Sequence, residues 1–128
     1  MSLILIVEDN EKNMKLVRDV LQAKGYATIE AITGADGVRL ATERKPDLIL
    51  MDIQMPGLNG FQATRELASD PETRSIPVIM VTSKAQESDR VWGLRQGAVD
   101  YLVKPVAMDQ LVRKAQAALA AWRPGGAG

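Results

Sequence analysis

The chain has 128 residues, 46% hydrophobic and 25% charged, and this much apolar material fits one globular domain with a single core. Its 16 basic and 16 acidic side chains cancel, so the overall charge does not favour DNA or an anionic membrane as a partner. The absence of cysteine and histidine excludes disulfides, thiol nucleophiles, imidazole bases and metal sites built on either residue.

Short apolar runs alternate with stretches whose apolar residues have helical spacing. The runs predict strands over 3–7, 26–31, 47–51, 77–81 and 101–103, and the stretches between and after them predict helices over 10–25, 34–45, 60–70, 85–97 and 108–122. The apolar stripe of the first helix contains Met14, Leu16, Val17, Val20 and Leu21. Gly25 suits the left-handed position that ends this helix, whereas the last helix lacks a good capping residue at its start.

Runs that are apolar on both faces, such as LILIV over 3–7, are typical of parallel strands covered by helices on both sides. We therefore predict a three-layer, doubly wound α/β sandwich with a five-stranded parallel sheet, and a common order for such sheets is 2-1-3-4-5. No apolar run is long enough to cross a membrane and no basic-then-apolar leader is present, so we expect a cytoplasmic protein that does not bind membranes. The segment 123–128, RPGGAG, reads as a flexible tail or linker stub after a domain over 1–122.

Polar side chains follow the predicted strands, at the edge of the sheet where such folds bind ligands. Glu8 and Asp9 follow the first strand, Asp52 the third, Thr82 the fourth and Lys104 the fifth. Three carboxylates at one edge repel one another unless a cation lies among them, and oxygen ligands without histidine or cysteine select Mg²⁺ or a similar ion. With an ammonium and a hydroxyl added, the set predicts a phosphoryl-binding site.

Each of these residues alone has an ordinary structural explanation. Glu8 and Asp9 also suit a helix N-terminus capped by Asn10, Asp52 suits a turn, and Lys104 suits a solvated surface. Their joint placement after separate strands favours the site.

The segments LIVEDN, DLILMDIQMPGLNG, VIMVTSK and GAVDYLVKP resemble the signature segments of the two-component response-regulator receiver domain, over about 3–119. The resemblance implies a flavodoxin-like fold in which Asp52 accepts a phosphoryl group from a phosphohistidine on a partner. It further implies that Asp9, Asp52 and the backbone carbonyl of Gln54 ligate Mg²⁺, while Glu8 acts through a coordinated water.

The same resemblance makes Lys104 the contact for the phosphoryl oxygens, with a cis peptide bond to Pro105, and makes Thr82 and Tyr101 a switch pair. Thr82 would turn to the phosphoryl group and Tyr101 would fill the vacated space. The changed surface would be the fourth helix, fifth strand and fifth helix, roughly 85–122. The implied partners are a sensor histidine kinase or histidine phosphotransfer protein and a downstream protein target. We expect a switch that catalyses only its own phosphoryl transfer and dephosphorylation.

Two other classes share parts of this pattern. A phosphatase of the haloacid dehalogenase type needs a second acid two residues after its aspartate, where this chain has Gln54. A flavodoxin-like FMN protein needs a phosphate-binding loop after the first strand, where this chain has Glu8 and Asp9. A purely structural interaction module remains an alternative. Trp92 is predicted to be a core residue, with a partner contact as its alternative role.

Different parts of the chain resemble different single-domain receivers. MPGLNGFQATREL and QESDRVWGLRQGAVDYLVKP are similar to receivers of twitching-motility and chemotaxis-like systems, whereas LIVEDNEKNMKLVRDVLQAKGY is similar to receivers of cell-cycle phosphorelays. We expect stand-alone action through protein contact; a receiver excised from a hybrid kinase or multidomain regulator is the alternative.

Overall fold

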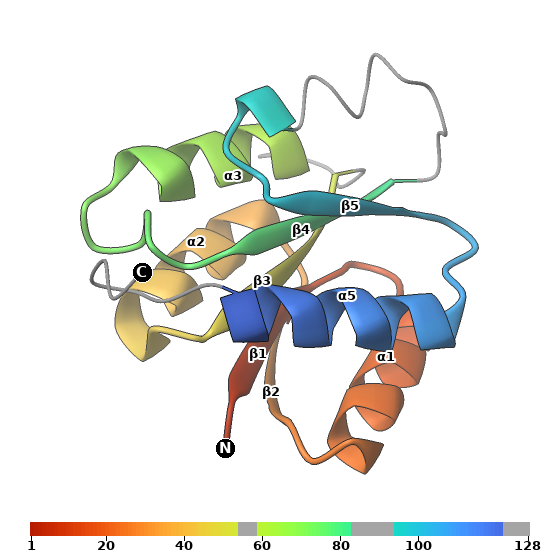
Figure 1. Ribbon diagram of the computed structural model, residues 1–128. Coiled ribbons are helices and arrows are strands. Elements are labelled where there is room, and N and C mark those ends of the chain that lie inside the picture. Colours follow the sequence, from red (N-terminus) through yellow and green to blue (C-terminus); the bar gives the residue numbers. More distant parts are fainter. Residues whose placement is uncertain (54–58, 83–93, 122–128) are drawn as a thin grey trace.

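The computed structural model describes residues 1–53, 59–82 and 94–121 (Figure 1). Its elements are β1 (Leu3–Val7), α1 (Glu11–Ala23), β2 (Ala27–Ala31), α2 (Gly34–Arg44), β3 (Leu48–Asp52), α3 (Gly60–Ser69), β4 (Val78–Thr82), β5 (Asp100–Val103) and α5 (Met108–Ala121). Most of the predicted helix over 85–97 lies outside the described residues, together with Trp92, Gln54 and the tail over 123–128.

The strands form one parallel sheet in the order β2-β1-β3-β4-β5, which confirms the predicted fold class (Figure 1). Several bounds differ from the prediction by one or two residues. Two of these differences concern site residues: Asp52 belongs to β3 and Thr82 to β4, because their backbones are in register with Val81 of β4 and Val103 of β5. Since all strands run the same way, their C-terminal ends meet at one edge of the sheet.

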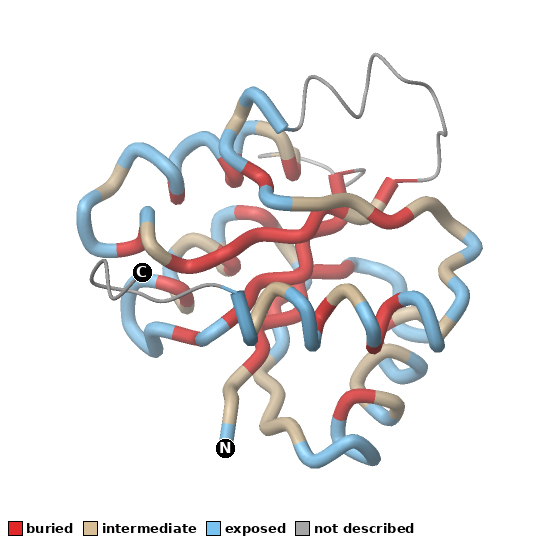
Figure 2. Tube along the Cα trace, viewed as in Figure 1, coloured by how far each residue is buried: buried red, intermediate tan, exposed pale blue. Residues whose placement is uncertain are grey.

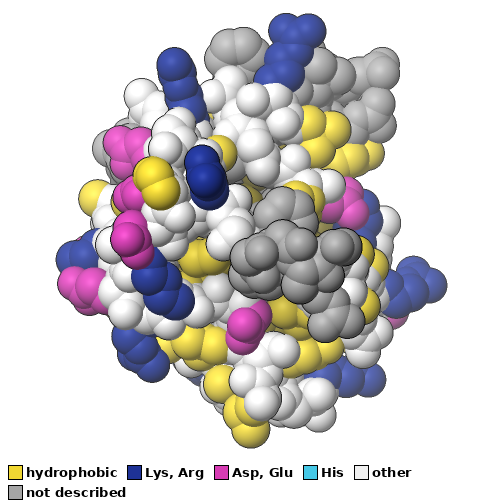
Figure 3. Space-filling view, turned by 60° about the vertical axis from the view of Figure 1, so that its left-hand side comes forward, with side chains coloured by type: hydrophobic (Ala, Val, Ile, Leu, Met, Phe, Trp, Pro, Cys, Tyr) yellow, Lys and Arg dark blue, Asp and Glu magenta, His cyan; other side chains and the backbone are white. Residues whose placement is uncertain are grey.

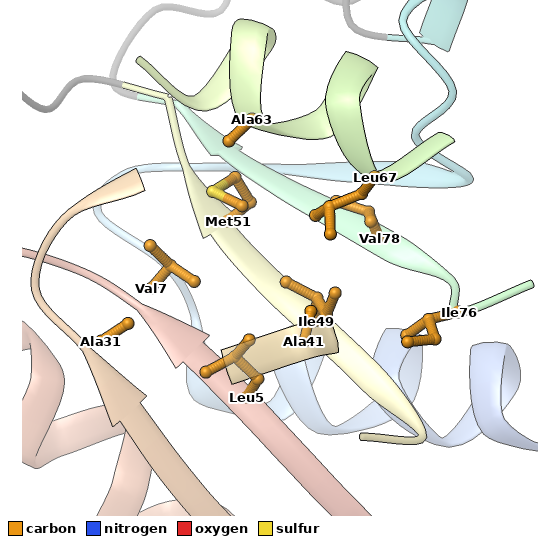
Figure 4. Packing of buried hydrophobic residues seen from close by; sticks show 10 residues of the cluster. All are labelled: Leu5, Val7, Ala31, Ala41, Ile49, Met51, Ala63, Leu67, Ile76 and Val78. Atoms are coloured by element: carbon orange, nitrogen blue, oxygen red, sulfur yellow. The ribbon is translucent and has the colours of Figure 1, made fainter. Parts of the chain in front are cut away.

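Helices cover both faces of this sheet. On one face, α2 and α3 pack against alternate residues of the central strands, including Leu5, Ile49 and Met51 (Figure 4). On the other face, α1 and α5 pack against the remaining alternate residues of the same strands, such as Ile4, Ile6 and Leu50. The central strands are largely buried (Figure 2), and most of their apolar residues alternate between the two cores.

Side chains at the helix N-termini supply the local start signals. Asn10 accepts a hydrogen bond from the backbone of Asn13 at 3.0 Å and caps α1. Asn59 and Gln62 form a reciprocal capping box on α3. Gly25, at φ 92°, takes the left-handed position expected for it after α1.

Basic and acidic side chains lie among one another on the face drawn in Figure 3. Several ion pairs of the molecule join residues one helical turn apart, such as Arg39 with Glu43 at 3.1 Å on α2. Within the described ranges, no helix combines the length and apolarity needed to span a bilayer.

Candidate functional site

Three carboxylates gather at the C-terminal edge of the sheet. Glu8 and Asp9 follow β1, and Asp52 is the last residue of the neighbouring strand β3. Each offers one oxygen, and these oxygens lie within 4.8 Å of one another. The chain leaves β1 and β3 towards helices on opposite faces, so this position is the switch point at which doubly wound folds bind ligands. The structure therefore brings together the three acids that the sequence placed after separate strands.

Two of the three acids are withdrawn from water. Asp52 is 2% exposed and Glu8 is 6% exposed, whereas Asp9 lies at the surface. Burial, reinforced by a hydrogen bond with Asp52 and by its charge, raises the pKa of Glu8 to about 7, although the Asn10 backbone N–H and the Lys104 ammonium act in the opposite direction. The cluster thus concentrates negative charge that the fold only partly neutralises.

Lys104 supplies a positive charge from the far side of the site. Its Nζ lies 3.1 Å from Oδ2 of Asp52 and 3.3 Å from Oε1 of Glu8. Burial lowers the pKa of Lys104, but the hydrogen bonds and charges of these two acids outweigh it and leave the pKa above its ordinary value. The side chain is therefore a cation. The Lys104–Pro105 peptide bond is cis, as the resemblance implied.

Thr82 lies on β4, the neighbour of β3, and Tyr101 lies on β5, the next strand along the sheet. Thr82 ends β4 and is 3% exposed, in register with Val103 of β5. Tyr101 is half-buried and packs against the small cluster of Ile53, Met80 and Ala98. Ile53 directly follows Asp52, so Tyr101 contacts the segment that carries the central carboxylate.

A cavity of about 390 Å³ adjoins the acid cluster. Glu8, Asp52 and Lys104 form its polar end, and the apolar remainder includes Leu16, Val17, Val106, Met108 and Leu111. The apolar stripe of α1 includes Leu16, which is 50% exposed. The apolar stripe is therefore wider than the surface that α1 buries. We call this feature the site cavity.

The donor set fits Mg²⁺. Mg²⁺ prefers oxygen ligands, binds one or two carboxylates and retains waters that a phosphate can replace. Asp9 and Asp52 supply two such carboxylates, and Glu8 lies close enough to hold a bound water. Gln54, the remaining expected ligand, lies outside the described residues.

A doubly wound parallel sheet with an acid cluster and a lysine at its switch point defines a phosphoryl-handling α/β domain. Residues 4–116 match the family described as "Response regulator receiver domain", and the chain belongs to this family. The receiver resemblance seen in the sequence is confirmed.

Relatives and solved structures agree with this assignment. The chain is 54% identical to Protein PilH of Pseudomonas aeruginosa over 120 residues, which cover 94% of this chain and 99% of PilH. It is 46% identical to the polar-differentiation response regulator DivK of Brucella anthropi over 110 residues, covering 85% of this chain and 89% of DivK. The chain is thus similar to two kinds of single-domain receiver, as its sequence segments indicated. The pathway in which this chain acts stays a prediction.

Among solved structures, the receiver domain of the sensor histidine kinase PA1611 from Pseudomonas aeruginosa superposes with a TM-score of 0.87 at 36% identity, covering 94% of this chain and 98% of that one. That structure has a magnesium ion coordinated in its active site cleft. The Vibrio cholerae chemotaxis protein CheY4 superposes with a TM-score of 0.87 at 26% identity, covering 92% of this chain and 98% of CheY4. The chain is thus a receiver domain of the kind that acts as a switch in two-component signalling.

Proposed function

We propose that Asp52 is the phosphoacceptor of this receiver and that the reaction depends on Mg²⁺. The observation that carries the proposal is the position of Asp52, which is buried at the end of β3 with two further carboxylates within 4.8 Å and the Lys104 ammonium at 3.1 Å. A cation on one side and an ammonium on the other hold the negative charge of an incoming phosphoryl group.

We assign the remaining roles as the receiver resemblance implies them. Asp9, Asp52 and the backbone carbonyl of Gln54 would hold the ion, and Glu8 would act through a bound water. The ion, when bound, offsets the charge of the carboxylates and of the phosphoryl oxygens. An oxygen of Asp52 forms a bond to phosphorus while the bond from phosphorus to the donor breaks, and the donor keeps the bonding electrons. Lys104 moves its hydrogen bond from Asp52 to a phosphoryl oxygen.

The phosphoryl donor lies outside these 128 residues, because they contain no histidine. Two-component receivers work with histidine kinases and downstream targets. We assign a sensor histidine kinase or a histidine phosphotransfer protein as donor, and the site cavity as the place where its apolar surface docks. The apolar surface of the donor would pack against the exposed Leu16 and the half-buried Val106 and Met108, which line the cavity together with the acceptor carboxylate.

Phosphorylation is then read through Thr82 and Tyr101. The phosphoryl group adds negative charge and acceptor oxygens to Asp52, so the Thr82 hydroxyl turns to donate to it and Tyr101 fills the space that Thr82 leaves. The output surface comprises the helix predicted over 85–97, β5 and α5. We assign the receiver to residues 1–122, with 123–128 as tail or linker, and place the protein in the cytoplasm, where it catalyses its own phosphorylation and dephosphorylation.

Intact-mass spectrometry tests the proposal. Acetyl phosphate with Mg²⁺ should add one phosphoryl group to the wild type and to Asp109→Asn, whose carboxylate is exposed on α5, and none to Asp52→Asn. Omission of Mg²⁺ should abolish the addition. A phosphoryl group on Asp52→Asn, or none on the wild type, would overturn the assignment.

A further inference from the structure

Lys114 on α5 contacts Asp100 and Tyr101 at the start of β5. Lys114 Nζ donates to Oδ1 of Asp100 at 2.8 Å and to the carbonyl oxygen of Tyr101 at 3.0 Å. The same Nζ lies 4.9 Å from the centroid of the Tyr101 ring. The Asp100 carboxylate also accepts from the Tyr101 backbone N–H at 2.8 Å. One ammonium therefore holds the backbone, the neighbouring carboxylate and the ring together.

These contacts differ in what they constrain. The hydrogen bonds to Asp100 and to the Tyr101 carbonyl attach α5 to the backbone of β5, and they persist whichever way the ring points. The ring contact persists only while the ring stays beneath the ammonium, because the attraction acts on the face of the aromatic system. The Lys114 side chain is 25% exposed, so solvent screens this attraction less than at an open surface.

Tyr101 also connects Lys114 to the phosphoacceptor strand. Tyr101 packs against the cluster that contains Ile53 and Met80. Ile53 follows Asp52, and Met80 lies two residues before Thr82. Tyr101 thus contacts both the strand ends near the site and the helix that carries Lys114.

We propose that Lys114 is a positioning residue for Tyr101, holding the ring in the arrangement of the unphosphorylated protein and coupling its position to α5. The inference deepens the proposed function and rests on it for the part that Tyr101 plays in signalling. Lys104 donates directly to Asp52, a contact that the proposed phosphoryl transfer would redirect, so we assign this position of the ring to the state before transfer. Movement of the ring must break the ammonium–ring contact and change the surface that α5 presents.

Fluorine NMR of protein labelled with 3-fluorotyrosine tests this inference, because the chain has two tyrosines and therefore two resonances. Tyr101→Phe identifies the resonance of Tyr101. In the unmodified protein, Lys114→Met should shift this resonance part of the way towards its position in wild type treated with Mg²⁺ and beryllofluoride. The Tyr26 resonance should stay in place. An unchanged Tyr101 resonance in Lys114→Met would overturn the inference.

Two further variants separate the cation from the hydrogen bonds. Lys114→Arg keeps a cation and should leave the Tyr101 resonance near its wild-type position, whereas Lys114→Gln keeps a donor without charge and should shift it as Lys114→Met does. If Lys114→Met does not fold, equal resonances in the Arg and Gln variants overturn the inference by themselves. Arg113→Met, which removes an exposed ion pair with Asp109 on the same helix, is the matched control and should change nothing. These shifts are measured without phosphorylation, so they stand or fail independently of the mass change at Asp52.

Discussion

The Lys104 ammonium donates to the Asp52 carboxylate at 3.1 Å, although β4 lies between the strands that carry them. The lysine side chain reaches over the end of β4 and also meets Glu8 at 3.3 Å. One flexible cation therefore connects three strands at the sheet edge, and it occupies the place where an incoming anion would be neutralised.

Removal of this cation should destabilise the metal-free protein. In Lys104→Met, two buried carboxylates lose their ammonium partner, and the free energy of unfolding should fall by about 1–3 kcal/mol. Urea unfolding in EDTA measures the loss, and saturating Mg²⁺ should recover part of it by supplying another cation. Lys45→Met serves as control, since Lys45 pairs with Glu72 at the exposed surface and its loss should cost under about 1 kcal/mol. Equal losses in the two variants would contradict the bridging role.

The metal-free protein should also lose stability as the pH rises. Burial raises the pKa of Glu8 from 4.5 to about 7, so folding favours its protonated form. The stability that this proton confers is fully present below pH 4.5 and disappears as the pH rises through about 7. Urea unfolding in EDTA at pH 5.5 and pH 8 should show this decline in the wild type, and Glu8→Gln should reduce it. A decline of the same size in Glu8→Gln would assign it to other groups.

The sequence predicted the fold because the evidence for it is local. Strands apolar on both faces require cover on both sides, and parallel strands put their polar C-terminal neighbours at one edge. These two rules alone predict that Glu8, Asp9 and Asp52 lie together at one edge. The sequence does not predict the exposure of Leu16, because helical spacing gives the direction of a side chain but not the width of the surface that covers it.

Contacts between distant elements were beyond the same reasoning. The contact of Lys114 with Tyr101 depends on how α5 crosses the edge of the sheet, and no spacing within the chain encodes that crossing. The close approach of Gly60 to the backbone at the end of β3 could not be predicted from the sequence either, because a glycine at a helix start has several common explanations. The sequence therefore predicts which chemical groups gather at the site, but it does not predict the distances between helices and strands.

Gly60 should be intolerant of a methyl group. A Cβ on Gly60 would lie 2.5 Å from the carbonyl oxygen of Asp52 and would also meet the backbone of Ile53, neither of which can rotate away. Gly60→Ala should therefore reduce the free energy of unfolding by about 1–3 kcal/mol and weaken Mg²⁺ binding by displacing the end of β3. Gly37→Ala is the comparison: its Cβ would lie 2.8 Å from the Val7 side chain, which can shift where backbone cannot, and alanine favours a helix, so it should cost less than Gly60→Ala. Urea unfolding compares them, and an unaffected Gly60→Ala would contradict the packing.

Mg²⁺ affinity should depend on the carboxylates at the switch point and not on acidity in general. In isothermal titration calorimetry, Asp9→Asn and Asp52→Asn should each weaken binding at least about tenfold, or about 1.4 kcal/mol. Glu11→Gln should bind Mg²⁺ like the wild type, because Glu11 lies in the first turn of α1 outside the three-carboxylate cluster. Wild-type affinity for Mg²⁺ in both aspartate variants would show that these carboxylates do not bind the ion.

Docking of a protein donor should depend on Leu16, whereas a small donor should not. Leu16 is 50% exposed and lines the site cavity, so Leu16→Ser removes apolar contact area without opening the core. Phosphoryl transfer from a phosphorylated histidine-containing partner should slow by roughly tenfold, the equivalent of about 1.4 kcal/mol of lost contact. Transfer from acetyl phosphate should keep its wild-type rate, because that donor needs only Asp52, Lys104 and the metal ion. Val99→Ser is the matched control, since Val99 is 39% exposed and precedes β5 at the opposite edge of the sheet. Quench-flow kinetics of both reactions decide the matter: equal slowing with both donors would place the effect of Leu16 in the chemistry of the site, and no slowing with the protein donor would move the docking surface elsewhere.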